Sequence, residues 1–164
     1  MTPPIISIIG KSGSGKTTLI EKILTELRRR GYRVATIKHH FHTDQTLDTP
    51  GKDTWRHAMA GAERVVLISP LTTVMFDYPP QPPSPQEIAA QMTGFDLIIA
   101  EGFSQANLPA IEVSRAARQI GLIGDPARLL AVAVDYPVDV TCPVFDLNDV
   151  GGLTTLIEQE VIRA

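Results

Sequence analysis

Several features that would assign this chain to a specialised class are missing from its sequence. There is a single cysteine, Cys142, so no intramolecular disulfide can form. The opening apolar run, residues 5–9, is too short to span a membrane, and no basic residues precede it as they would in a secretory signal. We therefore expect a cytoplasmic protein that does not enter a membrane.

An excess of positive charge is missing as well. Lys and Arg number 15 against 18 Asp and Glu, and the formal net charge is −3, so a broad surface for nucleic acid is not expected. The composition, 43% hydrophobic and 20% charged, is typical of a globular protein with a substantial core. A chain of 164 residues fits a single domain, so we expect one domain over residues 1–164.

Short β-branched runs alternate with helix-like segments, which is typical of α/β proteins. We expect strands over residues 5–9, 32–37, 64–68, 72–76, 96–100, 110–114, 129–134 and 143–145, and helices over 15–30, 52–61, 85–92 and 152–163. The first, second and fifth runs are apolar nearly throughout, as in parallel strands covered on both faces. The sequence therefore predicts a three-layer α/β sandwich with a mostly parallel sheet.

One pair of runs does not fit the parallel pattern. Only Ser69, Pro70 and Leu71 separate the runs at 64–68 and 72–76, which is the length of a hairpin loop. We expect an antiparallel hairpin at one edge of the sheet.

The segment GKSGSGKTT follows the first apolar run directly. It contains the P-loop pattern G-x-x-x-x-G-K-[ST] between a buried strand and an amphipathic helix, the context that the motif requires. Small residues let successive N–H groups point at a phosphate, and the new helix adds its positive end. We predict a P-loop NTPase fold whose phosphate-binding residues are Gly10, Lys11, Ser12, Gly13, Ser14, Gly15, Lys16, Thr17 and Thr18.

Two side chains of this segment have predicted chemical roles. Lys16 is expected to bridge the β- and γ-phosphate oxygens, which makes it a catalytic residue. The hydroxyl of Thr17 is expected to bind Mg²⁺.

A second acidic contact to the metal is expected near residues 95–102, FDLIIAEG. Asp96 precedes the strand and Glu101 follows it, so the two lie about 17 Å apart. Ligands of open parallel sheets bind at the carboxyl ends of the strands. We therefore predict Glu101 as a metal and catalytic residue, which holds Mg²⁺ or polarises the attacking water.

The second strand delivers Lys38, His39, His40 and His42 to the same rim. Three histidines could bind zinc, but their spacing matches no closed zinc motif and no cysteine is near. Contact with an anionic ligand and a plain polar loop are the other interpretations, and we predict that Lys38, His39 and His40 contact the nucleotide.

Asp44, Asp48 and Asp53 follow in the same long segment. Such a segment could order around a γ-phosphate as a switch loop. We predict that Asp48 reaches the metal.

Three segments together resemble the MobB family: GKSGSGKTT, IKHHFH with DTPGKDTWRHAMAGA, and LIIAEGFSQANLPAIEVSR. The resemblance covers essentially the whole chain. It implies a cytoplasmic, dimeric P-loop protein that binds GTP with Mg²⁺ and hydrolyses it weakly. It also implies a partner, the guanylyltransferase MobA, which attaches GMP to molybdopterin, and molybdopterin itself is a further candidate ligand.

Position by position, the resemblance implies phosphate and metal roles for Lys16 and Thr17 and the role of the second-motif acid for Glu101. Residues 48–53 match the DxPGKD stretch of the family, and the histidines match its His-rich run.

The base-reading pattern [NT]KxD is absent, so the preference for guanine rests on the resemblance alone. Asp135 and the stretch DLND, residues 146–149, are candidates for base contacts, with turn and helix-capping roles as the alternative. Lys11 stands where P-loop ATPases that pair face to face place an extra lysine, although a solvent-facing lysine is also common there.

Arginines for phosphoryl transfer are not clearly placed. Arg56 and Arg115 are candidates, with surface positions as the alternative, so we expect slow turnover. Two other classes stay open, a small-molecule kinase and a metallochaperone-type GTPase that uses the histidines. The kinase interpretation lacks an arginine-rich lid.

Overall fold

A computed structural model describes residues 2–40, 47–118 and 121–163 of the chain. It divides into two compact units, one formed by Met1–His40 with Ser84–Ala164 and the other by Phe41–Pro83. That the whole chain is a single domain stays a prediction. Within the described ranges, no helix combines the length and apolar character that a membrane span needs.

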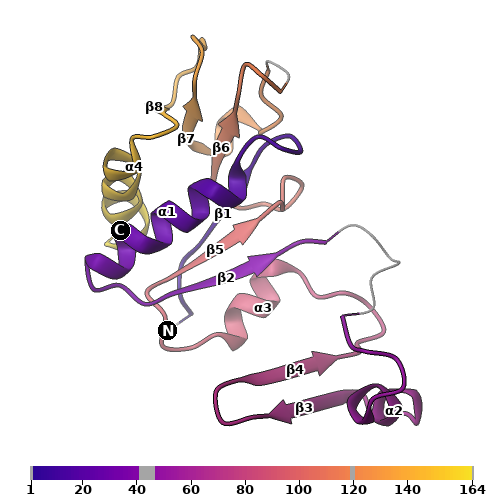
Figure 1. Cartoon of the computed structure of the whole chain (residues 1–164). Helices are drawn as coiled ribbons and strands as arrows, with labels where there is room; N and C mark the ends of the chain where they lie inside the picture. Colours follow the sequence, from indigo (N-terminus) through magenta and orange to yellow (C-terminus); the bar gives the residue numbers. More distant parts are fainter. Residues whose placement is uncertain (1, 41–46, 119–120, 164) are drawn as a thin grey trace. The chain divides into compact units, whose positions relative to one another are not determined.

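The first unit is built on a six-stranded sheet in which every pairing is parallel, in the order β2-β5-β1-β6-β7-β8 (Figure 1). The predicted α/β fold with a mostly parallel sheet is confirmed. The strands are β1 (Ile5–Ile9), β2 (Val34–Lys38), β5 (Leu97–Glu101), β6 (Ala110–Ser114), β7 (Leu129–Val134) and β8 (Val144–Asp146).

Helices cover the sheet because its central strands are apolar on both faces. Helix α1 (Lys16–Arg29) and helix α4 (Val150–Ile157) lie on one side, and helix α3 (Pro85–Gln91) lies on the other (Figure 1). The predicted apolar stripe of α1 is confirmed, since Leu19, Ile23 and Leu27 are buried. Side chains of β1, β5, β6, β7 and α4 complete that core, among them Ile6, Ile8, Ile99, Ile111, Ala133, Leu153 and Ile157.

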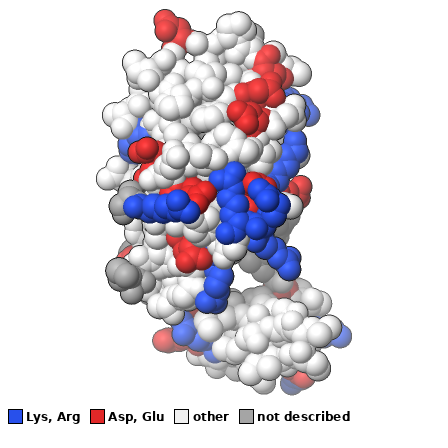
Figure 2. All heavy atoms as spheres, turned by 90° about the vertical axis from the view of Figure 1, so that its left-hand side faces the viewer, with Lys and Arg blue, Asp and Glu red and all other residues white. Residues whose placement is uncertain are grey.

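The end of α1 is tied to the chain's C-terminal segment by charged side chains. Arg30 donates to Glu26 at 2.9 Å and to Glu158 at 2.9 Å, and Tyr32 donates to Glu158 at 2.7 Å. Hydrogen bonds from Arg29 and Arg30 lower the pKa of Glu26 to about 2. Figure 2 looks at this side of the molecule, where basic side chains gather with acidic ones among them.

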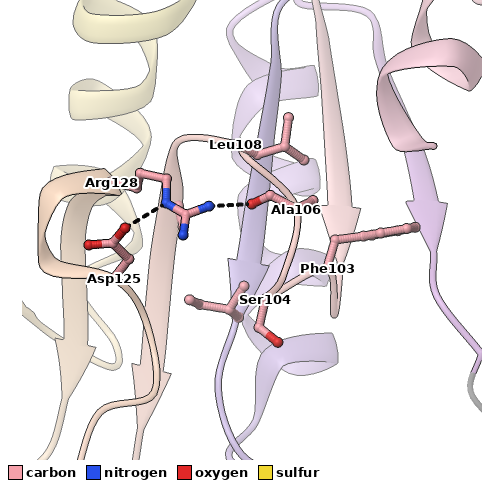
Figure 3. Close-up of a pocket in the computed structure, with 8 residues that line it drawn as sticks. Phe103, Ser104, Ala106, Leu108, Asp125 and Arg128 are labelled. Atoms are coloured by element: carbon pink, nitrogen blue, oxygen red, sulfur yellow. Dashed lines mark hydrogen bonds and ion pairs between the residues drawn. The ribbon is translucent and has the colours of Figure 1, made fainter.

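The other face of the sheet contains a buried carboxylate. Glu112 is fully buried in β6 and accepts hydrogen bonds from the backbone N–H groups of Ile123 and Gly124, at 2.7 and 2.8 Å. Nearby, Arg128 donates to Asp125 and to the carbonyl oxygen of Ala106 (Figure 3). These bonds fix the connection between β6 and β7 and the loop that follows β5.

The second unit contains helix α2 (Asp53–Met59) and the antiparallel strands β3 (Arg64–Ile68) and β4 (Thr73–Asp77). The predicted hairpin is confirmed, but its predicted place is not. It forms a two-stranded sheet of its own instead of an edge of the parallel sheet. The strands β3 and β4 pair with each other only, and β2 and β8 are the edge strands of the large sheet, so the hairpin loop predicted this local pairing but not the sheet that the hairpin would join.

We expect truncation of Ile23 to test the core beneath the sheet. Its side chain is fully buried, so Ile23→Ala should lower the free energy of unfolding by about 2–5 kcal/mol in a urea titration. Glu21→Ala, at an exposed position of the same helix, should change it by less than about 0.5 kcal/mol. Similar losses in both variants would contradict this account of the core.

Candidate functional site

The turn between β1 and α1 requires glycine for backbone reasons. Gly10, Gly13 and Gly15 have φ angles of +141°, +71° and +97°, in the region that side chains disfavour. A Cβ atom on Gly10 would lie 2.2 Å from the carbonyl oxygen of Val113 in β6. The turn therefore passes directly against the neighbouring strand.

The start of α1 suits an anion. Gly15 is the N-cap residue, and among the described residues the helix has no side-chain cap hydrogen bond. Those groups have no partner within a helix, and the helix dipole adds partial positive charge at the same end. Phosphate groups bind at such ends. Beside them, the buried hydroxyl of Ser14 has no hydrogen-bond partner within the described ranges.

Lys16 folds back over this turn. Its ammonium group donates to the carbonyl oxygens of Gly10 and Lys11, both at 2.9 Å. Burial is the main cause that lowers the pKa of Lys16; Glu101 opposes the shift and Lys38 adds to it. The cation thus stays beside the N–H groups to which a phosphate would bind.

Thr17, Glu101 and Lys38 meet on the adjoining rim of the sheet. The hydroxyl of Thr17 donates to Oε1 of Glu101 at 3.0 Å, and the ammonium nitrogen of Lys38 lies 3.3 Å from the same oxygen. The strands explain this meeting, because Glu101 pairs with Ile8 on one side and with Lys38 on the other. Asp96, at the opposite end of β5, accepts a hydrogen bond from the N–H group of Arg33.

A cleft of about 490 Å³ opens where these groups meet. That volume is in the range of small-molecule sites. The lining residues come from the turn, from β5 and from the residue after β6: Ser12, Gly13, Gly15, Lys16, Thr17, Thr18, Glu101 and Arg115. Lys11 lies beside the cleft, and its ammonium nitrogen would be 3.6 Å from a Cβ atom on Gly121.

Arg115 is the lining residue that sequence reasoning undervalued. It directly follows Ser114, the last residue of β6, at the same carboxyl edge as Glu101. The rule that ligands bind at the carboxyl ends of parallel strands could have pointed to it once β6 was placed beside β1. The pairing of Lys38 with Glu101 was also missed, because it depends on the lateral neighbours of β5.

Among the histidines that follow β2, His39 packs against the protein. His39 stacks on Phe103 with ring centroids 4.8 Å apart, and its N–H group donates to the carbonyl oxygen of Glu101. His42 and Asp44 lie outside the described residues. In the ranges that the structure covers, no group of three or more His, Cys, Asp or Glu could hold a metal ion. That His39 and His40 contact a ligand stays a prediction.

Asp48 belongs to the second unit. Its Oδ1 accepts hydrogen bonds from the hydroxyl of Thr54 at 2.9 Å and from the N–H group of Thr49 at 2.7 Å. Its Oδ2 is buried without a hydrogen-bond partner within the described part of the chain. Arg56, in α2, lies 3.9 Å from Asp53. The metal role of Asp48 stays a prediction.

The candidates for base contacts gather at the ends of β7 and β8. Asp135 and Asp146 line a cavity of about 410 Å³ together with Tyr136, Pro137, Val134, Val144 and Phe145. Asp135 accepts a hydrogen bond from the N–H group of Ala116, and Asp149 caps α4 by accepting from Gly152. The capping role that sequence reasoning offered as the alternative is therefore present at Asp149.

Comparison with known proteins adds to this geometry. Residues 5–135 match the model of the family MobB, molybdopterin guanine dinucleotide synthesis protein B. The chain belongs to the MobB family. The resemblance read from the sequence is confirmed.

Two curated relatives match this chain over most of their own lengths. Over 157 residues the chain is 38% identical to a molybdopterin-guanine dinucleotide biosynthesis adapter protein of Haemophilus influenzae, which covers 94% of this chain and 88% of that protein. A protein of the same name from Escherichia coli is 33% identical over 164 residues, or 94% and 91% of the two chains.

Solved structures of MobB proteins have the same fold. The Bacillus subtilis MobB structure gives a TM-score of 0.73 at 23% identity, over 96% of this chain and 98% of that one. A structure of molybdopterin-guanine biosynthesis protein B gives 0.68 at 30% identity, over 98% and 99%.

In this MobB-family chain, we expect Gly10→Ala to lower the free energy of unfolding by more than the cost of placing alanine at a positive φ angle. Gly31 also has a positive φ, +91°, but a Cβ atom there would meet nothing within 4 Å. Gly31→Ala should therefore cost only about 1–2 kcal/mol of unfolding free energy. Gly10→Ala should cost clearly more, because the carbonyl of Val113 must move. Equal losses of unfolding free energy for the two variants in urea titrations would show that the close approach of Gly10 to Val113 does not limit this position.

Proposed function

We propose that this chain is a GTP-binding adaptor in molybdenum cofactor maturation. It assists the guanylyltransferase that converts molybdopterin to molybdopterin guanine dinucleotide. The main support is the meeting of Lys16, Thr17 and Glu101 around one cleft. The names of the Haemophilus influenzae and Escherichia coli relatives support the pathway.

The residues of the cleft fit Mg²⁺. The Thr17 hydroxyl and the Glu101 carboxylate are hard oxygen donors that already lie within hydrogen-bond distance of each other. Magnesium prefers such donors and is commonly held by one or two protein groups together with substrate phosphates. Bound there, the ion would neutralise charge on the β- and γ-phosphates. We propose Asp48 as a further ligand of the ion.

Weak hydrolysis is the activity that we propose. Glu101 is suited to orient a water, and Lys16 to offset the charge of the γ-phosphate. Among the described residues that line the cleft, Arg115 is the one arginine, and it follows β6, whereas Glu101 ends β5. Without an arginine at the γ-phosphate, turnover is slow, which suits an adaptor that is gated by its nucleotide.

We propose that the cavity at the ends of β7 and β8 receives the guanine base. A carboxylate accepts hydrogen bonds from the N1–H and amino groups of guanine, and adenine has no such pair of donors. Asp135 and Asp146 both line this cavity. Tyr136 and Phe145 supply aromatic surface beside them.

We also propose a cytoplasmic homodimer that pairs through the hairpin of the second unit. Large apolar side chains are exposed on this hairpin, namely Val66, Leu67, Ile68, Leu71 and Met75. Patches of this kind mark protein interfaces, and an isolated two-stranded hairpin is only marginally stable.

The nucleotide proposal predicts a magnesium-dependent affinity for GTP that exceeds the affinity for ATP. Thr17→Ala and Glu101→Gln should each remove most of the effect of Mg²⁺, a loss of about tenfold or more, because each deletes an interaction with a charged group. Isothermal titration calorimetry with GTP, ATP and Zn²⁺ measures this.

Thr25→Ala is the matched control. Thr25 lies on the exposed face of the same helix and donates to the carbonyl oxygen of Glu21, so the GTP affinity should not change. Turnover of ATP with a small acceptor would indicate a kinase, and tight zinc binding a metallochaperone; either result contradicts the proposal.

The dimer proposal predicts that a charge on the hairpin separates the protomers. Ile68, which is 76% exposed, is the site for Ile68→Asp, and the variant should sediment as a monomer in analytical ultracentrifugation. Leu47→Asp, at an exposed position outside the hairpin, should leave the mass unchanged. A wild-type protein that sediments as a monomer at high concentration would end the proposal.

A further inference from the structure

The side chain of Arg115 packs against the turn between β1 and α1. A Cβ atom on Gly15 would be 3.1 Å from Nη2 and 3.2 Å from Nε of Arg115. The guanidinium group therefore covers Gly15, the N-cap residue of α1. It also lines the cleft, and its Nε atom is buried without a hydrogen-bond partner within the described ranges.

The backbone around Arg115 is held in place. The N–H group of Ala116 donates to Oδ1 of Asp135 at 2.7 Å, and the N–H group of Arg118 donates to the carbonyl oxygen of Arg115 at 3.1 Å. The hydroxyl groups of Ser114 and Tyr136 are hydrogen-bonded at 2.6 Å. The turn after β6 thus presents the guanidinium from a fixed position.

A buried guanidinium nitrogen without a partner points to an anionic ligand. Buried polar groups in proteins are almost always hydrogen-bonded. A ligand bound in the cleft could supply the partner that this nitrogen lacks. Arginine is suited to phosphate because its planar fork forms paired, charge-assisted hydrogen bonds.

The strand order indicates which end of a nucleotide's phosphate chain Arg115 would contact. Strand β1 lies between β5 and β6, so Glu101 and Arg115 approach the turn from opposite sides. Thr17 and Glu101 mark the metal side, and in P-loop proteins the metal bridges the β- and γ-phosphates. The opposite side of the turn would therefore face the α-phosphate end of a bound triphosphate.

We propose that Arg115 binds the α/β end of the nucleotide's phosphate chain and does not act on the γ-phosphate. It is a binding residue contributed by the same chain from the connection between β6 and β7. This inference rests on the proposed function, because it assumes a nucleoside triphosphate in the cleft with its metal beside Glu101.

A comparison of GTP with GDP tests the assignment. Arg115→Gln should weaken the binding of GTP and GDP alike, each by about tenfold, because both nucleotides keep the phosphates in question. Arg115→Lys should lose less for both, since it keeps the charge and loses the fork. Calorimetry with Mg²⁺ present gives the dissociation constants, and circular dichroism checks folding.

Arg28→Gln controls for the loss of one positive charge. Arg28 lies in the last turn of α1, about 18 Å along the helix axis from its first residue, so both affinities should stay at the wild-type value. Should Arg115→Gln not fold, Arg115→Lys decides by the same criterion.

The outcomes separate this inference from the proposed function. A loss confined to GTP would place Arg115 at the γ-phosphate and overturn the inference, as would unchanged affinity for both nucleotides in the Arg115 variants. A wild-type protein that binds neither nucleotide would overturn the proposed function itself.

Discussion

The pairing of β1 with β5 on one side and with β6 on the other is the constraint on which the site depends. Ile8 pairs with both Glu101 and Ile111, and its carbonyl oxygen accepts the N–H group of Gly102 at 3.1 Å. Because the strands are parallel, their carboxyl ends share one rim. A shift of one residue in β5 would turn Glu101 to the other face and separate it from Thr17.

The same pairing limits the turn after β1. Gly10 passes so close to the carbonyl of Val113 that β6 forms one wall of the turn. From the same side, Arg115, the residue after β6, lies over Gly15. The backbone N–H groups at the start of α1 are therefore held by their neighbours before any ligand binds, which reduces the ordering cost of binding an anion.

Sequence patterns predicted the elements whose structure depends on residues close together in the sequence. The apolar run at 5–9, the glycines behind it and the stripe of α1 lie next to each other in the sequence, so the strand, turn and helix could be read together. Glu101 was distinguished from Asp96 by the length of the strand between them and by the rule that ligands bind at the carboxyl ends of parallel strands. The site residues on neighbouring strands were harder, because the order of strands in a sheet is not encoded in any single segment. For that reason the Lys38 pairing was missed, the position of Arg115 was left open between a phosphate contact and the surface, and the hairpin was assigned to the wrong sheet.

Charge inside the cleft would allow a chain with a net negative charge to bind the anion that we propose. The chain has a formal net charge of −3, yet Lys16 and Arg115 line the cleft together with Glu101, and Lys38 forms an ion pair with the carboxylate of Glu101. Lys16 donates to two neutral carbonyl oxygens of its own turn, and hydrogen bonds to a charged acceptor are roughly twice as strong. A phosphate oxygen can therefore displace those carbonyls with a net gain. Selection of such a ligand would therefore be set by the geometry of this cleft and not by the charge of the surface as a whole.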